Sequence, residues 1–355
     1  MKIKIILLFL LLISQNAIGQ TPADEIAVKA FDLMRNNKFD EAIAEIGKAI
    51  AMEPKNASRY IARGNIYRMA KDYPNVRKDA ELAMLLEPES EKTLMSVARL
   101  LDTGFCEDCE RMASITTAFL TNSQKSAAAY SRRSSTKICF GDLLGAFNDA
   151  SRAAELEPGS VAYRQNRINL ISRLGDDRRA LELYQVIIDE LKPMVVKAEA
   201  TQDASPLLEL RGIYRARAAV HERMGNMDLA IADLTRGVEL HEDENSLKPR
   251  FDAYRKTGRL AEAITDLSKI IVFSKKPFLP ETTPPVAPFA VEGMKRRIAS
   301  QLFERATLYT TLGKYQEALA DLHECLTYDP SGKDRFEKRI AEVKTKQADA
   351  AAKPK

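Results

Sequence analysis

Polar and apolar positions follow the period of an amphipathic α-helix along most of the chain. In the segment 39–54 the apolar residues Ala42, Ile43, Ile46, Ala49 and Ile50 recur at helical spacing, with polar residues between them. This spacing places the apolar side chains on one face of a helix, which becomes buried when the helix packs against a neighbour. The pattern predicts an all-α protein built from packed amphipathic helices.

Four segments repeat one sixteen-residue pattern: 39–54, 73–88, 143–158 and 315–330. Each has a small or branched apolar residue twelve places before its final proline: Ala42, Val76, Ala146 and Ala318. A second small residue stands five places before the proline: Ala49, Ala83, Ala153 and Cys325. Small side chains let two helices approach closely, and proline ends a helix. We therefore expect these segments to be the second helices of repeated helical pairs.

The spacing of about thirty-four residues between neighbouring copies resembles the tetratricopeptide repeat, a helix–turn–helix unit whose copies stack into a solenoid. The second unit has the fullest set of matching positions: Tyr60, Arg63, Gly64, Tyr67, Tyr73, Ala80, Ala83 and Pro88. The resemblance implies a right-handed superhelical solenoid of about eight units with a C-terminal capping helix. It also implies a scaffold or adaptor that binds a protein or peptide in its concave groove and catalyses nothing itself.

The resemblance and the breaks in the pattern divide the chain into eight segments. These are a signal peptide (1–19), units one to five (20–194), a connecting segment (195–210), units six and seven (211–277), a Pro-rich loop with a helix start (278–298), unit eight (299–332), the capping helix (333–346) and a disordered tail (347–355). The segment 277–288 contains five prolines, which favour an extended backbone. Two interpretations remain open for it, a surface loop and a gate over the concave groove.

The first nineteen residues have the composition of a cleavable signal peptide. Lys2 and Lys4 precede the apolar run 5–13, and Ala17 and Gly19 form a small-x-small cleavage pattern. The apolar run is shorter than the roughly 20 residues that cross a bilayer as a helix. We expect export to the periplasm or secretion, without stable insertion in a membrane after cleavage.

Composition argues against several classes of function. The formal net charge is only +4, so the chain has no electrostatic requirement for a nucleic acid partner. The sequence lacks the residue patterns of a nucleophile elbow, an H-E-x-x-H zinc site and a phosphate-binding glycine loop. We therefore expect no enzyme activity, no cofactor and no metal. Capture of an envelope glycan is the alternative to protein binding, although the chain has no tryptophan to form a sugar platform.

An arginine recurs sixteen residues before an aspartate in five units. The pairs are Arg63 with Asp79, Arg133 with Asp149, Arg217 with Asp233, Arg250 with Asp266, and Arg305 with Asp321. The arginine falls on the first helix of a unit and the aspartate on the second, always at the same phase. We expect a ladder of structural ion pairs, because a ligand contact would rarely need the same pair five times.

Polar and basic residues at the outward positions of first helices are the candidate peptide-binding groove. They are Asn166, Asn169, Arg173, Arg215, Arg223, Lys248, Arg255 and Lys256. Glu222 and Asp252 lie among them. The surplus of basic groups suggests an acidic peptide or a chain-terminal carboxylate as the partner, held by charge-assisted hydrogen bonds.

Three cysteines lie close enough in the repeat pattern to form a disulfide. Cys106 and Cys109 form a C-x-x-C motif, and Cys139 lies near the same level of the next unit. An exported chain meets an oxidising compartment, so we expect one disulfide, either within the motif or across the two units. Cys325 occupies a small-residue position and is expected to be free. His221 stands where other units have a core tyrosine, so we expect it to pack in the core.

Overall fold

The computed structural model describes residues 21–102, 106–201, 204–278 and 288–352. These ranges contain seventeen α-helices, two short 3-10 helices and no β-strand. This confirms the predicted all-α class. The expected signal peptide, residues 1–19, lies outside the described residues.

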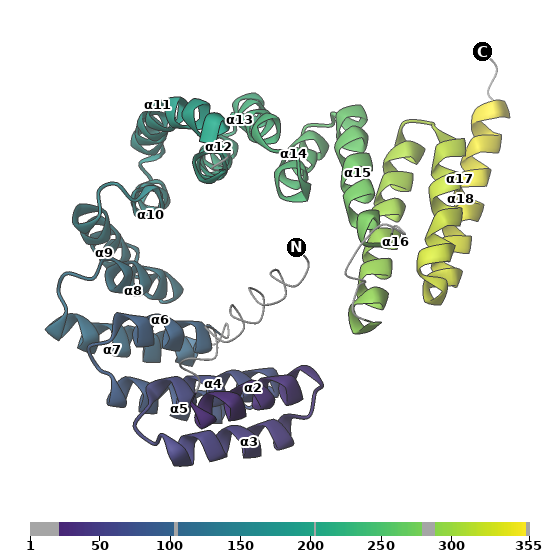
Figure 1. Cartoon of the computed structure of the whole chain (residues 1–355). Coiled ribbons are helices and arrows are strands. Elements are labelled where there is room, and N and C mark those ends of the chain that lie inside the picture. Colours follow the sequence, from purple (N-terminus) through teal and green to yellow (C-terminus); the bar gives the residue numbers. More distant parts are fainter. Residues whose placement is uncertain (1–20, 103–105, 202–203, 279–287, 353–355) are drawn as a thin grey trace, which may run out of the picture. The chain divides into compact units, whose positions relative to one another are not determined.

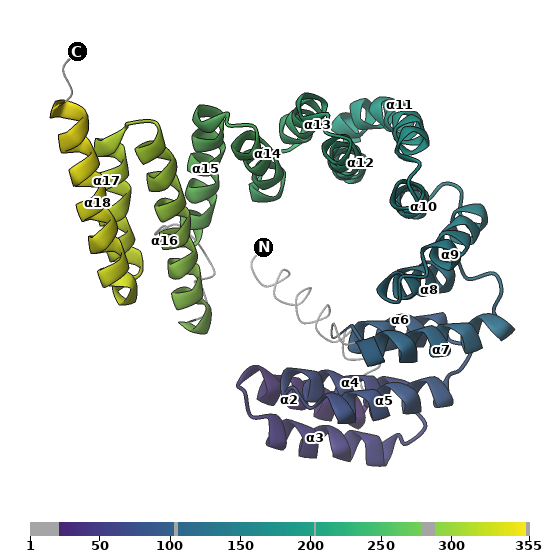
Figure 2. The same cartoon turned by 180° about the vertical axis from the view of Figure 1, so that it is seen from behind.

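The chain divides into two compact units, Met1–Gly175 and Asp176–Lys355 (Figure 1). The helices of the first unit are α2 (Pro22–Arg35), α3 (Phe39–Met52), α4 (Ala57–Met69), α5 (Tyr73–Leu86), α6 (Glu91–Leu100), α7 (Cys106–Asn122), α8 (Ala127–Cys139), α9 (Leu143–Leu156) and α10 (Val161–Arg173). Those of the second unit are α11 (Asp177–Thr201), α12 (Ser205–Arg223), α13 (Met227–Leu240), α14 (Glu244–Lys256), α15 (Leu260–Lys275), α16 (Pro288–Thr311), α17 (Tyr315–Tyr328) and α18 (Lys333–Ala352). Within each unit, consecutive helices pack side by side, as Figure 2 also shows from behind.

Polar residues and glycines at fixed places determine where the helices begin and end. Six first helices start after a residue whose side-chain oxygen accepts a hydrogen bond from a backbone amide of the first turn: Thr21, Asn56, Ser90, Ser126, Ser160 and Asp243. Five turns contain a glycine with φ between 71° and 101°, which is a left-handed conformation that glycine adopts without steric cost: Gly141, Gly175, Gly225, Gly258 and Gly313.

The small residues of the repeated segments are buried at every copy. The four residues twelve places before the prolines are at most 1% exposed: Ala42, Val76, Ala146 and Ala318. The four residues five places before the prolines are 0% exposed: Ala49, Ala83, Ala153 and Cys325. Larger side chains at these positions would separate neighbouring helices, because protein interiors are close-packed.

The structure brings together every arginine and aspartate of the expected ladder. In each pair the arginine Nε donates to Asp Oδ2 at 2.8–2.9 Å, and Nη2 donates to Oδ1 at 2.6–2.7 Å. The five aspartates are at most 5% exposed. Lys29 and Glu45 form an equivalent pair at 2.8 Å between α2 and α3. A bidentate contact between two planar groups fixes distance and orientation, so it sets the register of the two helices.

Four of the five ladder arginines also reach a helix of the preceding pair. Arg250 Nη1 on α14 lies 3.4 Å from Thr235 Oγ1 on α13, and Arg305 Nη1 on α16 donates to Ser268 Oγ on α15 at 2.9 Å. The guanidinium groups of Arg250 and Arg305 therefore each join three helices, two from their own pair and one from the pair before.

Several expected segment boundaries differ from the structure. The connecting segment 195–210 is largely helical, because α11 continues to Thr201 and α12 begins at Ser205. The tail 347–355, expected to be disordered, is helical as far as Ala352, since its alanine-rich sequence extends the capping helix α18. The segment 278–298 was expected to contain a Pro-rich loop and a helix start, and α16 begins within it, at Pro288; residues 279–287 lie outside the described residues. The boundary between the two compact units falls inside the expected fifth repeat.

Replacing Arg217 by alanine should destabilise the second unit strongly. The change leaves Asp233, which is 5% exposed, without its counter-charge, and an unpaired buried charge typically costs about 3–5 kcal/mol. Urea unfolding followed by circular dichroism measures the effect. The matched control is Arg178→Ala, whose side chain is 90% exposed and whose loss should cost less than about 1 kcal/mol. Equal effects of the two substitutions would contradict a structural role for the ladder.

Candidate functional site

The eight candidate groove residues belong to both compact units. Asn166, Asn169 and Arg173 lie on α10 in the first unit. The five basic residues, Arg215, Arg223, Lys248, Arg255 and Lys256, lie on α12 and α14 in the second. The two groups are therefore described separately.

A groove of about 300 Å³ lies between α12 and α14. Its apolar lining consists of Ala218, Ala219, Leu234, Pro249 and Ala253. Its charged lining consists of Arg215, Glu222, Lys248, Asp252 and Lys256. Three of the five basic candidates thus line one concavity. The alanines open this space because they extend only a methyl group from each helix.

Two of the three basic groups in the groove are neutralised by acidic neighbours. Lys248 Nζ donates to Asp252 Oδ1 at 3.1 Å along α14, and Lys256 on α14 pairs with Glu222 on α12. Arg215 differs from both, because its exposed guanidinium has no hydrogen-bond or ion-pair partner among the described residues. It is the basic group of the groove that is available to a ligand.

The other two basic candidates are held by acidic residues of other helices. Arg223 contacts Asp177 at the start of α11 with Nε at 3.2 Å, and Arg255 Nη1 donates to Glu304 Oε1 on α16 at 3.0 Å. The hydrogen bond to Asp177 raises the pKa of Arg223 above its usual value. Sequence reasoning missed both acidic partners, because they lie 46 and 49 residues away along the chain, outside the repeat period.

On α10, the candidate residues lie in a different environment. Asn166 is partly buried, and its Nδ2 lies 3.5 Å from Ser134 Oγ on α8. Asn169 and Arg173 are exposed.

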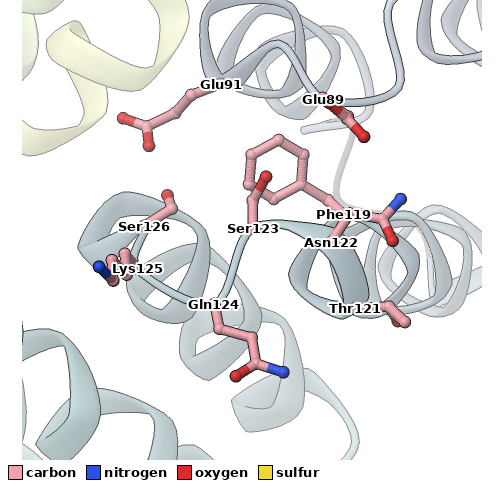
Figure 3. Close-up of a pocket in the computed structure, with 9 residues that line it drawn as sticks. All are labelled: Glu89, Glu91, Phe119, Thr121, Asn122, Ser123, Gln124, Lys125 and Ser126. Carbon is pink, nitrogen blue, oxygen red and sulfur yellow. The ribbon is translucent and has the colours of Figure 1, made fainter.

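The first unit has an open pocket of about 580 Å³ that the sequence did not indicate (Figure 3). It lies between the turn that precedes α6 and the turn that joins α7 to α8. Glu89 and Glu91, at the start of α6, line one side of it, and Gln124 and Lys125, in the turn after α7, line the other. Phe119 contributes an aromatic side chain. The polar lining carries charges of both signs, so it does not select one class of ligand.

Two described cysteines lie in contrasting environments. Cys139, at the end of α8, is an exposed free thiol, so the cross-unit disulfide is not formed in this structure. Cys109 lies in the first turn of α7, and the side chain of Cys106 lies outside the described residues, so the bridge within the C-x-x-C motif stays a prediction. Cys325 is a free and fully buried thiol, and burial raises its pKa to about 12.

His221 lies beside a ladder pair. Its Nε2 is 3.9 Å from Asp233 Oδ2, and its Nδ1 is buried without a hydrogen-bond partner among the described residues. Burial lowers the pKa of His221 below its usual value of 6.5, and the partly opposing influence of Asp233 does not reverse the shift. The imidazole is therefore neutral at neutral pH and acts as a packing group.

Metal and membrane signatures are absent from the part of the chain that the structure describes. Within those residues, His, Cys, Asp and Glu side chains do not gather in groups of three or more that could hold a metal ion. The described helices include none that is long and apolar enough to span a bilayer.

One family model matches part of the chain. Residues 302–331 match the model described as "Tetratricopeptide repeat". They comprise the C-terminal part of α16, all of α17 and the turn after it. The chain therefore contains a tetratricopeptide repeat where the eighth unit was expected.

Several known proteins are similar to longer stretches. The human protein "DnaJ homolog subfamily C member 3" is 24% identical over 211 residues, which are 59% of this chain and 37% of that protein, so the match spans little more than a third of the relative. A tetratricopeptide repeat protein from Parabacteroides merdae is 14% identical with a TM-score of 0.44, over 81% of this chain and 98% of its own. The C-terminal part of a TPR repeat-containing protein from Cytophaga hutchinsonii is 15% identical with a TM-score of 0.40, over 88% and 98%.

Thiol labelling of the native protein should distinguish Cys139 from Cys325. The thiolate is the reactive form, and a pKa of about 12 leaves only about 10⁻⁴ of Cys325 ionised at pH 8. We expect an alkylating reagent to modify Cys139 rapidly and Cys325 roughly a thousandfold more slowly until the protein is unfolded. Mass mapping identifies the modified residues. A Cys139 that reacts only after reduction would restore the cross-unit disulfide.

The substitution His221→Tyr should remove part of the acid sensitivity of the second unit. The folded protein favours the neutral imidazole, so its stabilising contribution is present above pH 6.5 and is lost as the pH falls through the lowered pKa. The free energy of unfolding of the native protein should therefore decrease relative to that of the variant below pH 6.5. Denaturant melts at several pH values measure this difference. A difference that stays constant from pH 7.5 to pH 5 would show that His221 is not the titrating group.

Proposed function

We propose that this chain is an exported, non-catalytic scaffold that binds an acidic segment of a partner protein in the groove between α12 and α14. The exposed Arg215 carries the proposal, because its guanidinium lacks a partner among the described residues and borders an apolar surface. The helical-pair fold and the tetratricopeptide repeat at 302–331 support a general role in protein–protein interaction.

The groove offers two kinds of contact to an acidic peptide. A carboxylate can accept two parallel hydrogen bonds from the Arg215 guanidinium, which is a stronger and more directional contact than a lysine provides. Apolar side chains next to that carboxylate can cover Ala218, Ala219 and Ala253. The two existing ion pairs hold the lysines beside their own acidic neighbours, so the ligand does not have to neutralise them.

A peptide suits the lining better than a sugar does. The residues that line the groove include no aromatic side chain, whereas glycan sites usually have a flat aromatic surface on which a sugar ring stacks. The signal-peptide composition expected of residues 1–19 supports the proposal that binding takes place in the periplasm or outside the cell.

Replacing Arg215 by serine should weaken binding of an acidic peptide and leave the fold intact. Fluorescence anisotropy with a glutamate-rich peptide should show a dissociation constant about tenfold higher, equivalent to about 1.4 kcal/mol. The melting temperature should hardly change, because an exposed charge contributes on the order of 0–1 kcal/mol. Arg178→Ser is the control for a lost exposed arginine outside the groove. The proposal fails if the two variants bind the peptide equally well, or if a lysine-rich peptide of the same length binds the native protein as tightly.

A further inference from the structure

An apolar groove of about 360 Å³ lies between α5 and α7 in the first unit. Its apolar lining consists of Met84, Leu85, Pro88, Ile115, Ala118 and Phe119. Ala118 extends only a methyl group from α7, which leaves space between the two helices. The volume falls in the range of about 300–1,000 Å³ that is usual for ligand clefts, so the groove can enclose apolar side chains of a ligand.

Leu85 is an apolar residue that the helical pair itself does not require. Its side chain is 76% exposed, more than any other large apolar side chain in the described part of the chain. It stands three places before the proline of its repeated segment, and the other three segments have Ala51, Glu155 and Thr327 at this position. Because Leu85 borders Ile115 and Phe119 in one groove, the exposed apolar surface is contiguous, and such surfaces mark contacts with other molecules.

Ion pairs between α5 and α7 neutralise the charges at one end of the groove. Arg77 Nε on α5 donates to Asp108 Oδ1 on α7 at 2.6 Å, and Arg111 on α7 pairs with Glu81 on α5. The residue numbers of these contacts increase together, so the two helices run in the same direction. The carboxylate of Glu81, which lines the groove, is therefore already paired.

The opposite end of the groove carries negative charge that is not compensated. Phe119 and Asn122 line both the groove and the polar pocket of about 580 Å³, so the two hollows adjoin (Figure 3). Glu89 and Glu91 of that pocket are exposed and have no ion-pair partner among the described residues. They outnumber Lys125, the basic residue in the same lining. The pocket alone selects no ligand class, but beside the apolar groove its carboxylates favour a cation that adjoins an apolar side chain.

We propose that the groove between α5 and α7 binds a segment of a partner protein in which aliphatic residues stand next to lysine or arginine. The aliphatic side chains cover Leu85 and Ile115 and are removed from water, which supplies most of the affinity. The basic group pairs with Glu89 or Glu91 at the end of the groove nearest α6. An exposed pair of this kind adds little affinity, but it fixes the direction in which the segment lies.

This site differs from the groove between α12 and α14 in position and in charge. It uses helices of the first unit, whereas the groove that contains Arg215 lies in the second. An acidic segment, which suits Arg215, would be repelled here by Glu89 and Glu91. Binding at the two sites can therefore be observed separately.

The first experiment measures binding of a fluorescent leucine–lysine peptide by anisotropy. We expect Leu85→Ala, which matches the alanine of the first repeated segment, to raise the dissociation constant about tenfold, because the peptide loses an apolar contact surface. The control is Leu144→Ala, which removes a leucine of the same unit that is 64% exposed and lies outside the groove. This control should bind the peptide as the native protein does. Thermal melts should show that both variants are folded, since both side chains are exposed.

A second set of measurements tests the charge of the ligand. Replacing both Glu89 and Glu91 by glutamine should weaken binding of the leucine–lysine peptide about threefold and reduce its dependence on salt. A leucine–glutamate peptide and a serine–lysine peptide of the same length should each bind the native protein about tenfold more weakly, because each lacks one of the two required features. Arg215→Ser should keep the affinity for the leucine–lysine peptide.

Three results would overturn the inference. The first is equal binding of the leucine–lysine peptide by Leu85→Ala and Leu144→Ala, and the second is equally tight binding of the leucine–glutamate peptide by the native protein. The third is a native dimer that Leu85→Ala converts to a monomer in analytical ultracentrifugation, because the groove would then be an interface between two copies of this chain.

Discussion

The bidentate contact between arginine and aspartate holds the helical pairs in a common register. Small residues let the helices approach, but a contact between alanines is compatible with several sliding positions of one helix along the other. The guanidinium removes this freedom, because Nε and Nη2 must meet both oxygens of one aspartate. Where Nη1 also reaches the preceding pair, as from Arg305 to Ser268, the same group carries the register from one pair to the next.

Because the aspartates of the ladder are buried, each of them requires a correctly placed counter-charge. Desolvation of an aspartate is tolerated only where its counter-charge has the right geometry, and a ladder residue that loses its partner leaves an unfavourable group behind. The same requirement affects the residues that lie beside the ladder aspartates. His221 occupies the position of a core tyrosine beside Asp233 and stays neutral, whereas Lys137 at the same place on α8 contacts Asp149 at 2.9 Å. Beside a buried ladder aspartate, the structure thus contains either a neutral side chain or a cation.

Periodic features could be predicted from the sequence, and non-periodic ones could not. The buried alanines and the ladder recur with the repeat, so aligning the copies was enough to identify them. The pair of Lys29 and Glu45 was not predicted, because it has lysine and glutamate where the other copies have arginine and aspartate. The contacts of Arg223 with Asp177 and of Arg255 with Glu304 join residues outside the repeat period, and only the folded chain reveals that these arginines are already paired.

The same comparison separates arginines that hold the fold from arginines that are available to ligands. A ladder arginine has a fixed phase, a buried carboxylate partner and a structural role. Arg215 follows no repeat pattern, and its guanidinium lies at the surface of a groove without a partner in the described part of the chain.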